Sequence, residues 1–235
     1  GNLFLMKPYS VDHFLAKEVI LEMLDSPESL TYLGVIDGFN WLTNHQSKIS
    51  INGLVEMEES LQEDKSIRDV LLLYQDKNLS KDQIITKRIA LFDLENDIKE
   101  AQDFPFHSYP LNQIGGIHLN AVEFMTDIHP IRSTDEAYAY IDRLNLFSSS
   151  FKATLEILNA QKDAGIFPPK FVYEHVIRQL NEFLSYEDSN NPLFKVFIRK
   201  IQNLDLQKSI HDELIFGLEE AINNSVKPGF KSLLD

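Results

Sequence analysis

The sequence predicts an all-α protein: a multi-helix array with one ordered non-helical crossing segment at about residues 104–132. Apolar residues recur three or four positions apart over most of the 235-residue chain, which is the spacing of one helix face. Serine residues that can cap a helix precede several of these stretches. Only residues 119–131 have a pattern that would also suit a strand or hairpin.

Helices near the N-terminus are predicted from their end signals. Ser10 precedes an amphipathic stripe. Ser26 followed by Pro27 is typical of an N-cap and a first helical turn, and Gly34 should end that short helix. Residues 35–48 show no clear pattern. We therefore expect two helices followed by a less regular stretch.

The next part of the chain predicts two longer helices. One pattern covers about residues 50–75, with a break expected at residues 62–66 because that stretch is polar. Ser80 and Gln83 form a capping box, in which each side chain can bind the other residue's backbone N–H. The helix that follows should cover about residues 81–101.

Helices also dominate the prediction after residue 132. Ser133 and Glu136 form a second capping box. Further helices are expected at about residues 150–164, 168–184, 192–203 and 206–224. Pro228–Gly229 should end the helical pattern, and the new apolar pattern after it stops at Asp235, as if the chain were cut. We see no repeat or linker, so a single helical domain over residues 1–235 is the prediction.

Composition limits the classes of partner. The chain is acidic, with 22 basic and 36 acidic residues and a net charge of −14. Nucleic-acid binding is not expected, because phosphate contacts require a basic face. No apolar run approaches the roughly 20 residues that span a bilayer. The chain is cysteine-free, which excludes thiol catalysis and thiolate metal sites.

The central non-helical segment is the first place to look for function. Pro105, Pro110 and the Gly115–Gly116 pair rule out a continuous helix there, and its apolar content argues for order. Amide side chains beside glycines can bind a peptide backbone, although they can equally satisfy backbone groups of the turn, which is the favoured interpretation. The candidate substrate-binding residues are Tyr109, Asn112, Gln113, Gly115, Gly116 and His118.

No complete catalytic motif is present in these 235 residues, and a His-Glu-x-x-His zinc motif is absent. His118, Glu123 and His129 could supply imidazole and carboxylate ligands to zinc. Their spacing fits neither a helix face nor strand alternation, so histidines that bind loop backbone or solvent are the favoured alternative. Asp142 and Arg143 predict a surface or inter-helix ion pair.

Several stretches, in order, resemble a large bacterial family of unknown function that is thought to be related to zinc metallopeptidases. They are YPLNQIGG (109–116), FMTDIHPI (124–131), DEAYAYIDRLNLF (135–147), GIFPPKFV (165–172) and, more weakly, SPESLTYLG (26–34). Members of that family are considerably longer than this chain. Their histidine–glutamate zinc motifs lie in the half that is absent here.

The resemblance implies a function for the chain. It would be the non-catalytic N-terminal helical portion of a zinc-dependent, peptidase-like hydrolase, inactive alone, with the Tyr109–His118 segment near a cleft for a peptide-like substrate. The partner would be the missing C-terminal portion, which would hold the zinc; no metal or other cofactor is expected within this chain. Relatives are often described as lipoproteins, which implies the cell envelope or periplasm, with the cytoplasm as the alternative. The competing hypothesis is a stand-alone helical module that binds a peptide or protein.

Overall fold

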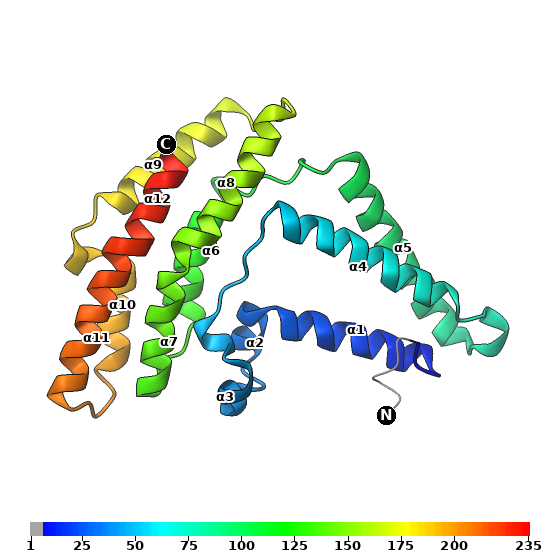
Figure 1. Ribbon diagram of the computed structural model, residues 1–235, viewed down its shortest axis with the longest axis horizontal. Helices are drawn as coiled ribbons and strands as arrows, with labels where there is room; N and C mark the ends of the chain where they lie inside the picture. The colour runs from blue at the N-terminus through cyan, green and yellow to red at the C-terminus, as the bar shows by residue number, and fades with distance from the viewer. Residues whose placement is uncertain (1–6) are drawn as a thin grey trace. The chain divides into compact units, whose positions relative to one another are not determined.

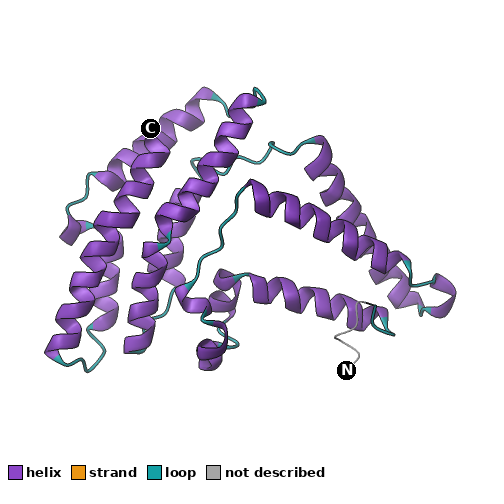
Figure 2. Ribbon diagram, in the orientation of Figure 1, coloured by secondary structure: helices purple, strands orange, loops and turns teal. Residues whose placement is uncertain are grey.

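A computed structural model describes residues 7–235, apart from the side chain of Asn40. Helices connected by loops make up the described part of the chain, which has no β-strand (Figures 1 and 2). The predicted all-α class is therefore confirmed. The chain divides into two compact units: unit 1 comprises residues 1–25 and 53–108, and unit 2 comprises residues 26–52 and 109–235. Each unit is described by itself, and the single domain expected from the sequence stays a prediction.

In its described residues unit 1 contains the α-helices α1 (Val11–Asp25), α4 (Leu54–Leu72) and α5 (Lys81–Asp103), with a 3₁₀ turn (Asp76–Asn78) between the last two. Its core gathers where α1 packs on α4 and α5, and comprises Val11, Phe14, Val70, Leu71 and Tyr74. The capping box of Ser80 and Gln83 is present at the start of α5, as predicted. The break expected at residues 62–66 is wrong: α4 is continuous there, because polar residues on an exposed face do not interrupt a helix.

Unit 2 begins with a segment of short elements, residues 26–52. It contains α2 (Pro27–Leu33), α3 (Asn40–Thr43) and two 3₁₀ turns. Ser26 caps α2 through its Oγ, which accepts a hydrogen bond from the Ser29 N–H. Gly34 ends α2 with φ 64°, so both predicted end signals are confirmed.

The remaining helices of unit 2 build the larger core. They are α6 (Ile117–Glu123), α7 (Thr134–Asn145), α8 (Phe147–Asp163), α9 (Lys170–Leu184), α10 (Pro192–Ile201), α11 (Lys208–Ala221) and α12 (Lys227–Leu234). Tyr140 on α7 is fully buried, and its hydroxyl donates to the Leu193 carbonyl at 3.1 Å. Phe151, Phe183 and Phe230 form a ring contact between α8, α9 and α12. These packed helices position the central segment.

The central segment is shorter than expected. Residues 104–116 are non-helical, but α6 begins at Ile117 and continues as a π-helical turn through Ile128. A strand or hairpin at residues 119–131 is therefore wrong. The apolar residues that suited a strand in the sequence instead form one face of a helix, and this face packs on the unit 2 core.

The predicted break at Pro228–Gly229 is also wrong. A π-helical turn joins α11 to α12, and the Lys227 N–H donates to the Ile222 carbonyl, five residues back. This wider turn accommodates a proline ring that would clash in a regular α-helix. Gly229 lies against α8: a Cβ atom there would be 3.0 Å from Phe151 Cδ2. Tertiary packing thus keeps helical a pair that sequence rules treat as a stop.

Candidate functional site

The turn from Tyr109 to Gly116 is held by the side chain of Asn112. Its Oδ1 accepts from the Ile114 N–H at 3.0 Å and from the Gly115 N–H at 2.8 Å. Its Nδ2 donates to the Tyr109 carbonyl at 3.0 Å. All polar atoms of this amide are therefore engaged with backbone, the role that the sequence interpretation favoured over ligand recognition.

The two glycines of this turn differ in their surroundings. A Cβ atom on Gly116 would be 2.6 Å from the Asn112 carbonyl oxygen and 2.8 Å from the His118 ring. Only a residue without a side chain fits there. A Cβ atom on Gly115 would meet nothing nearer than Asn120 Oδ1 at 3.9 Å. Gly116 therefore determines the close packing of the turn, and Gly115 does not.

A hydrogen-bonded chain joins the turn to α6 and α9. The Gln179 Nε2 donates to the Gln113 carbonyl at 3.1 Å, which fixes the orientation of the Gln179 amide. Its Oε1 then lies 3.0 Å from His118 Nε2 and can only accept, so the imidazole proton is on Nε2. His118 is buried, and its Nδ1 lone pair has no partner among the residues described. Burial lowers the pKa of His118, and the bond to Gln179 opposes this shift.

Two other predicted residues present polar groups differently. The half-buried Gln113 offers its side-chain amide, which makes no hydrogen bond to the described part of the chain, in contrast to its carbonyl. The Tyr109 hydroxyl donates over a long 3.4 Å to the Phe167 carbonyl. The structure thus places Tyr109, Gln113 and His118 around one turn. Gln113 is the best placed to meet a ligand.

The hypothetical zinc ligands do not form a metal site. His129 Nδ1 lies 2.8 Å from an Arg143 nitrogen and its Nε2 lies 3.3 Å from the Glu136 carbonyl. His118 is committed to Gln179, and Glu123 is exposed. Among the described residues no group of three His, Asp or Glu side chains could hold a metal ion. The side chains of residues 7–235 therefore do not fit a zinc site.

A buried polar centre of unit 2 surrounds Arg143 on α7. Its guanidinium is fully buried and donates five hydrogen bonds to neutral acceptors. The acceptors are the carbonyls of Pro27, His45 and Lys48, Thr31 Oγ1 and His129 Nδ1. The guanidinium also lies 4.8 Å from the centre of the Phe124 ring. Arg143 thereby fastens the 26–52 segment to α7.

The surface or inter-helix ion pair expected of Asp142 and Arg143 is wrong. Arg143 follows Ala139 by four positions and Tyr140 by three, and both of these residues are buried. It therefore lies on the inward face of α7. This register was the available sequence signal, but sequence alone could not show which carbonyls would satisfy a buried cation. Burial lowers the pKa of Arg143 to about 10, while Glu28 and Asp37 oppose that shift.

His129 is the neutral partner of this cation. Its Nδ1 accepts from Arg143, so the ring proton lies on Nε2 and points at the Glu136 carbonyl. Burial, followed by the charge of Arg143, lowers the pKa of His129 to about 3. The Lys200 Nζ donates to the His129 carbonyl at 2.6 Å. His129 is thus a structural acceptor across the whole physiological pH range.

Further polar bonds hold the inner side of the 26–52 segment. The Glu28 carboxylate accepts from the Ser50 N–H and hydroxyl at 2.7 and 2.6 Å. Asp37 accepts from Arg132 and lies 3.3 Å from His45 Nε2. Its pKa is lowered, because Arg132 and His45 outweigh the desolvation that acts in the opposite direction. The segment is therefore anchored by hydrogen bonds rather than by an apolar core.

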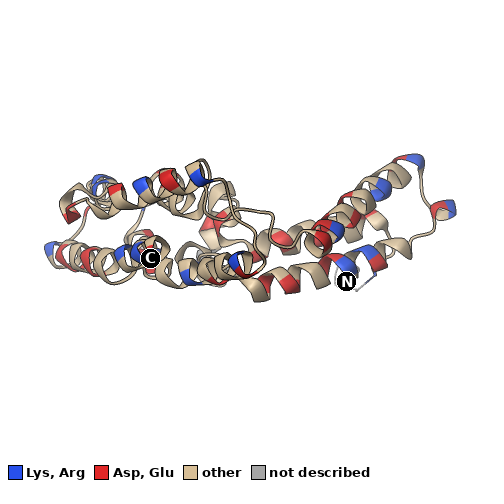
Figure 3. Ribbon diagram, turned by 90° about the horizontal axis from the view of Figure 1, so that it is seen from above, with Lys and Arg blue, Asp and Glu red and all other residues tan. Residues whose placement is uncertain are grey.

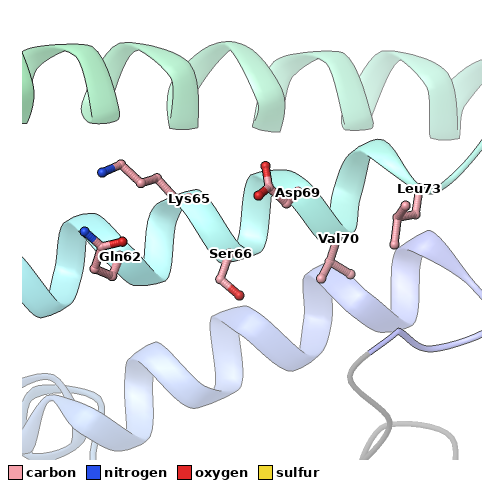
Figure 4. Close-up of a pocket in the computed structure, with 6 residues that line it drawn as sticks. All are labelled: Gln62, Lys65, Ser66, Asp69, Val70 and Leu73. Carbon is pink, nitrogen blue, oxygen red and sulfur yellow. The ribbon is translucent and has the colours of Figure 1, made fainter.

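Unit 1 carries a separate surface depression on α4. Its volume is about 460 Å³, and it is lined by Gln62, Lys65, Ser66, Asp69, Val70 and Leu73. Figure 4 shows Ser66 and Val70 pointing toward α1, with Lys65 and Asp69 on the other side of the helix. No acid–base or nucleophilic arrangement is apparent in this open depression. It is therefore a weaker candidate than the turn at Asn112.

Charge and hydropathy add little to the choice of site. Lys and Arg residues are interspersed with Asp and Glu along the helices (Figure 3). None of the helices in residues 7–235 is both long enough and apolar enough to span a membrane.

The fold and site define an all-helical protein with an arginine-centred core and an ordered Gly-Gly turn. The chain belongs to the family described as bacterial protein of unknown function (DUF885), whose model matches residues 27–235. The resemblance to a bacterial family of unknown function is thus confirmed, whereas the relation to zinc metallopeptidases stays a prediction. No curated protein matches the chain.

A solved structure has a similar fold. It is "putative lipoprotein from Colwellia psychrerythraea", with a TM-score of 0.75 and 19% sequence identity. The match covers 94% of this chain and 40% of the Colwellia chain. This chain therefore spans well under half the length of the protein that it resembles.

Proposed function

We propose that this chain is the non-catalytic N-terminal helical portion of a longer zinc-dependent, peptidase-like hydrolase. In this proposal the Tyr109–His118 segment forms part of the wall of the substrate cleft. The observation that carries it is the length relation: 94% of this chain matches only 40% of a longer protein. A peptide-like substrate and zinc chemistry come from the family resemblance of the sequence.

The rigidity of the turn supports a role in binding. Asn112 fixes the backbone through three hydrogen bonds, and Gly116 allows the close packing beneath it. The Gln113 carbonyl is held by Gln179, so the unengaged Gln113 amide projects from a fixed backbone. A primary amide offers a donor and an acceptor to a peptide group. Preorganised polar groups of this kind lower the entropic cost of binding.

Zinc would be held by residues outside this chain, since the side chains described here do not fit such a site. Zinc, when bound, would supply an activated water. The part assigned to this chain is to bind and orient the substrate.

The test compares the 235-residue chain with the product of its complete reading frame. Both are assayed on a panel of internally quenched peptides, with added zinc and with a chelator. We expect turnover by the longer protein that is lost with the chelator, and none by the 235-residue chain. Chelator-sensitive turnover by the 235-residue chain would refute the proposal that this portion is non-catalytic.

A variant tests the cleft wall. Gln113→Ala in the longer protein removes one neutral hydrogen bond to substrate, which is worth about 1 kcal/mol, or roughly fivefold in KM. The control is Gln102→Ala, at an exposed position on α5. Equal KM values for Gln113→Ala and the unsubstituted protein would show that Gln113 does not contact the substrate.

A stand-alone helical module that binds a peptide or protein is the second candidate. Ile85, Ile89 and Phe92 are spaced four and three residues apart on α5 and are 57, 58 and 65% exposed. Such a stripe suits a partner helix. A monomer or defined dimer of the 235-residue chain, with a reading frame that stops at Asp235, would favour this module.

We also propose a location at the cell envelope, with the cytoplasm as the alternative. The support is the lipoprotein description of the Colwellia protein that shares this fold. Fractionation of cells that express the complete reading frame, with detection in envelope and cytoplasmic fractions, tests it.

A further inference from the structure

The 26–52 segment has its polar side chains inside and its apolar side chains outside. Thr31, His45 and Gln46 are buried to 5, 1 and 1% exposure, whereas Leu30 is its only buried apolar residue. Seven large apolar side chains on it are exposed: Ile51 near its end, and six within residues 32–42, which are Tyr32, Leu33, Val35, Phe39, Trp41 and Leu42. We call these six residues the outer apolar surface. This distribution is the reverse of that expected for a segment facing water.

Hydrogen bonds on the inner side of the 26–52 segment keep its polar side chains inside and its apolar side chains outside. Arg143 binds the segment at Pro27, Thr31, His45 and Lys48. Gln46 donates to the Glu136 carboxylate at 3.2 Å. These groups would be left unsatisfied if the segment rolled over to bury its apolar side chains. The outer apolar surface is therefore presented in a fixed orientation.

The outer apolar surface also lacks free charge. Asp37 is the one acidic or basic residue within residues 32–42, and its carboxylate is engaged by Arg132 and His45. In a chain with 36 acidic residues and a net charge of −14, an aromatic stretch with one paired carboxylate is depleted of charge. Apolar, charge-depleted surfaces with tryptophan and tyrosine are typical of permanent interfaces. Trp41, at 79% exposure, is the most exposed member.

We propose that the outer apolar surface is the docking surface for the remaining portion of the longer polypeptide. This inference rests on the proposed function, since it requires that a further portion exists. Its occupant is chosen by the length relation, because the Colwellia chain with this fold continues well beyond the matched region. The segment lies almost wholly within the family match, which starts at residue 27. The surface should therefore be covered within one polypeptide.

The test uses Trp41, the only tryptophan in the 235-residue chain. Hydroxyl-radical footprinting with peptide mass spectrometry measures its oxidation rate in this chain and in the product of the complete reading frame. The rate follows the exposed area, so covering a side chain that is 79% exposed should lower it about tenfold in the longer protein.

Substitutions provide a second readout. Trp41→Ser should leave the thermal midpoint of the 235-residue chain unchanged, because little of the indole is buried there. The same substitution should lower the midpoint of the longer protein, and the conservative Trp41→Phe should restore most of it. Phe216→Ser, at a 66% exposed position on α11, is the matched control for loss of an exposed aromatic ring.

The outcomes separate this inference from the proposed function. Equal Trp41 oxidation in both proteins overturns the docking surface and leaves the proposed function standing. Protection of Trp41 in the 235-residue chain that depends on concentration identifies a second copy of the chain as the occupant, and this overturns the proposed docking surface. Protection of Trp41 in the 235-residue chain that does not depend on concentration also overturns the proposed docking surface. Protection of the longer protein only when zwitterionic lipid vesicles are added identifies a membrane instead. A reading frame that stops at Asp235 refutes both proposals.

Discussion

Replacing Arg143 by lysine tests whether the buried guanidinium fastens the 26–52 segment. Arginine makes five hydrogen bonds here, through Nε, Nη1 and Nη2. A lysine ammonium keeps the charge but has three donors at one point, so at least two acceptors lose their bond. At 1.5–3 kcal/mol for each bond to a charged donor, Arg143→Lys should cost about 3–6 kcal/mol. This is a large share of the stability of an ordinary domain.

The assay combines global and local measurements. Urea unfolding followed by circular dichroism gives the change in the free energy of unfolding. Hydrogen–deuterium exchange should show faster exchange in residues 26–52 than in α8, since the lost bonds all release the segment or its neighbour His129. Arg88→Lys is the control: the Arg88 side chain is 72% exposed, and its replacement should leave the unfolding midpoint unchanged. A cost below about 1 kcal/mol, with unchanged exchange in residues 26–52, would refute the reasoning.

Three further outcomes are expected. Gly116→Ala should destabilise the protein by about 1–3 kcal/mol because its Cβ would overlap the Asn112 carbonyl, whereas Gly115→Ala should cost less than about 0.5 kcal/mol; equal urea midpoints would contradict the packing argument. The pKa of His129 is about 3 in the folded protein against 6.5 for the unperturbed group, so the unfolded chain binds the proton first on acidification. The contribution of neutral His129 to the free energy of unfolding should therefore fall by about 2 kcal/mol from pH 6.5 to 5. His129→Gln should reduce the pH dependence of the stability, measured by urea unfolding, by that amount. An unchanged pH dependence would exclude His129 as its cause. Ser80→Ala should cost about 1 kcal/mol through loss of the α5 cap, measured by thermal unfolding, and a neutral result would show that α5 depends on packing alone.

Much of the fold was predictable because its signals are local. Ser26, Gly34 and the Ser80–Gln83 pair each satisfy backbone groups within a few residues of themselves, and the structure has all of them in these roles. The apolar period likewise identified the helices. The capping box at Ser133 is only half formed: Ser133 accepts from the Glu136 N–H, but the Glu136 carboxylate turns to the Arg132 N–H. A neighbouring arginine, four residues from Glu136, thus changed the local motif.

The candidate site was located by sequence in outline only. The glycine pair and the amides indicated the turn, and Asn112 binds the backbone as its residue type allows. Gln179 could not be found from sequence, because it lies 61 residues from the histidine that it contacts. The tautomer of His118 follows from that contact and from nothing nearer in the chain.

The sequence by itself determined the helical class, most helix ends and the family, because caps, glycine conformations and apolar periods act over a few residues. Only the tertiary structure decided that Arg143 is buried, that Pro228 lies within a continuous helical stretch, and that the 26–52 segment exposes its apolar side chains. Each of these depends on acceptors or neighbours far away in sequence: the Arg143 guanidinium reaches Pro27, 116 residues away. A buried cation is stable only where such distant carbonyls converge, and local patterns carry no information about that convergence.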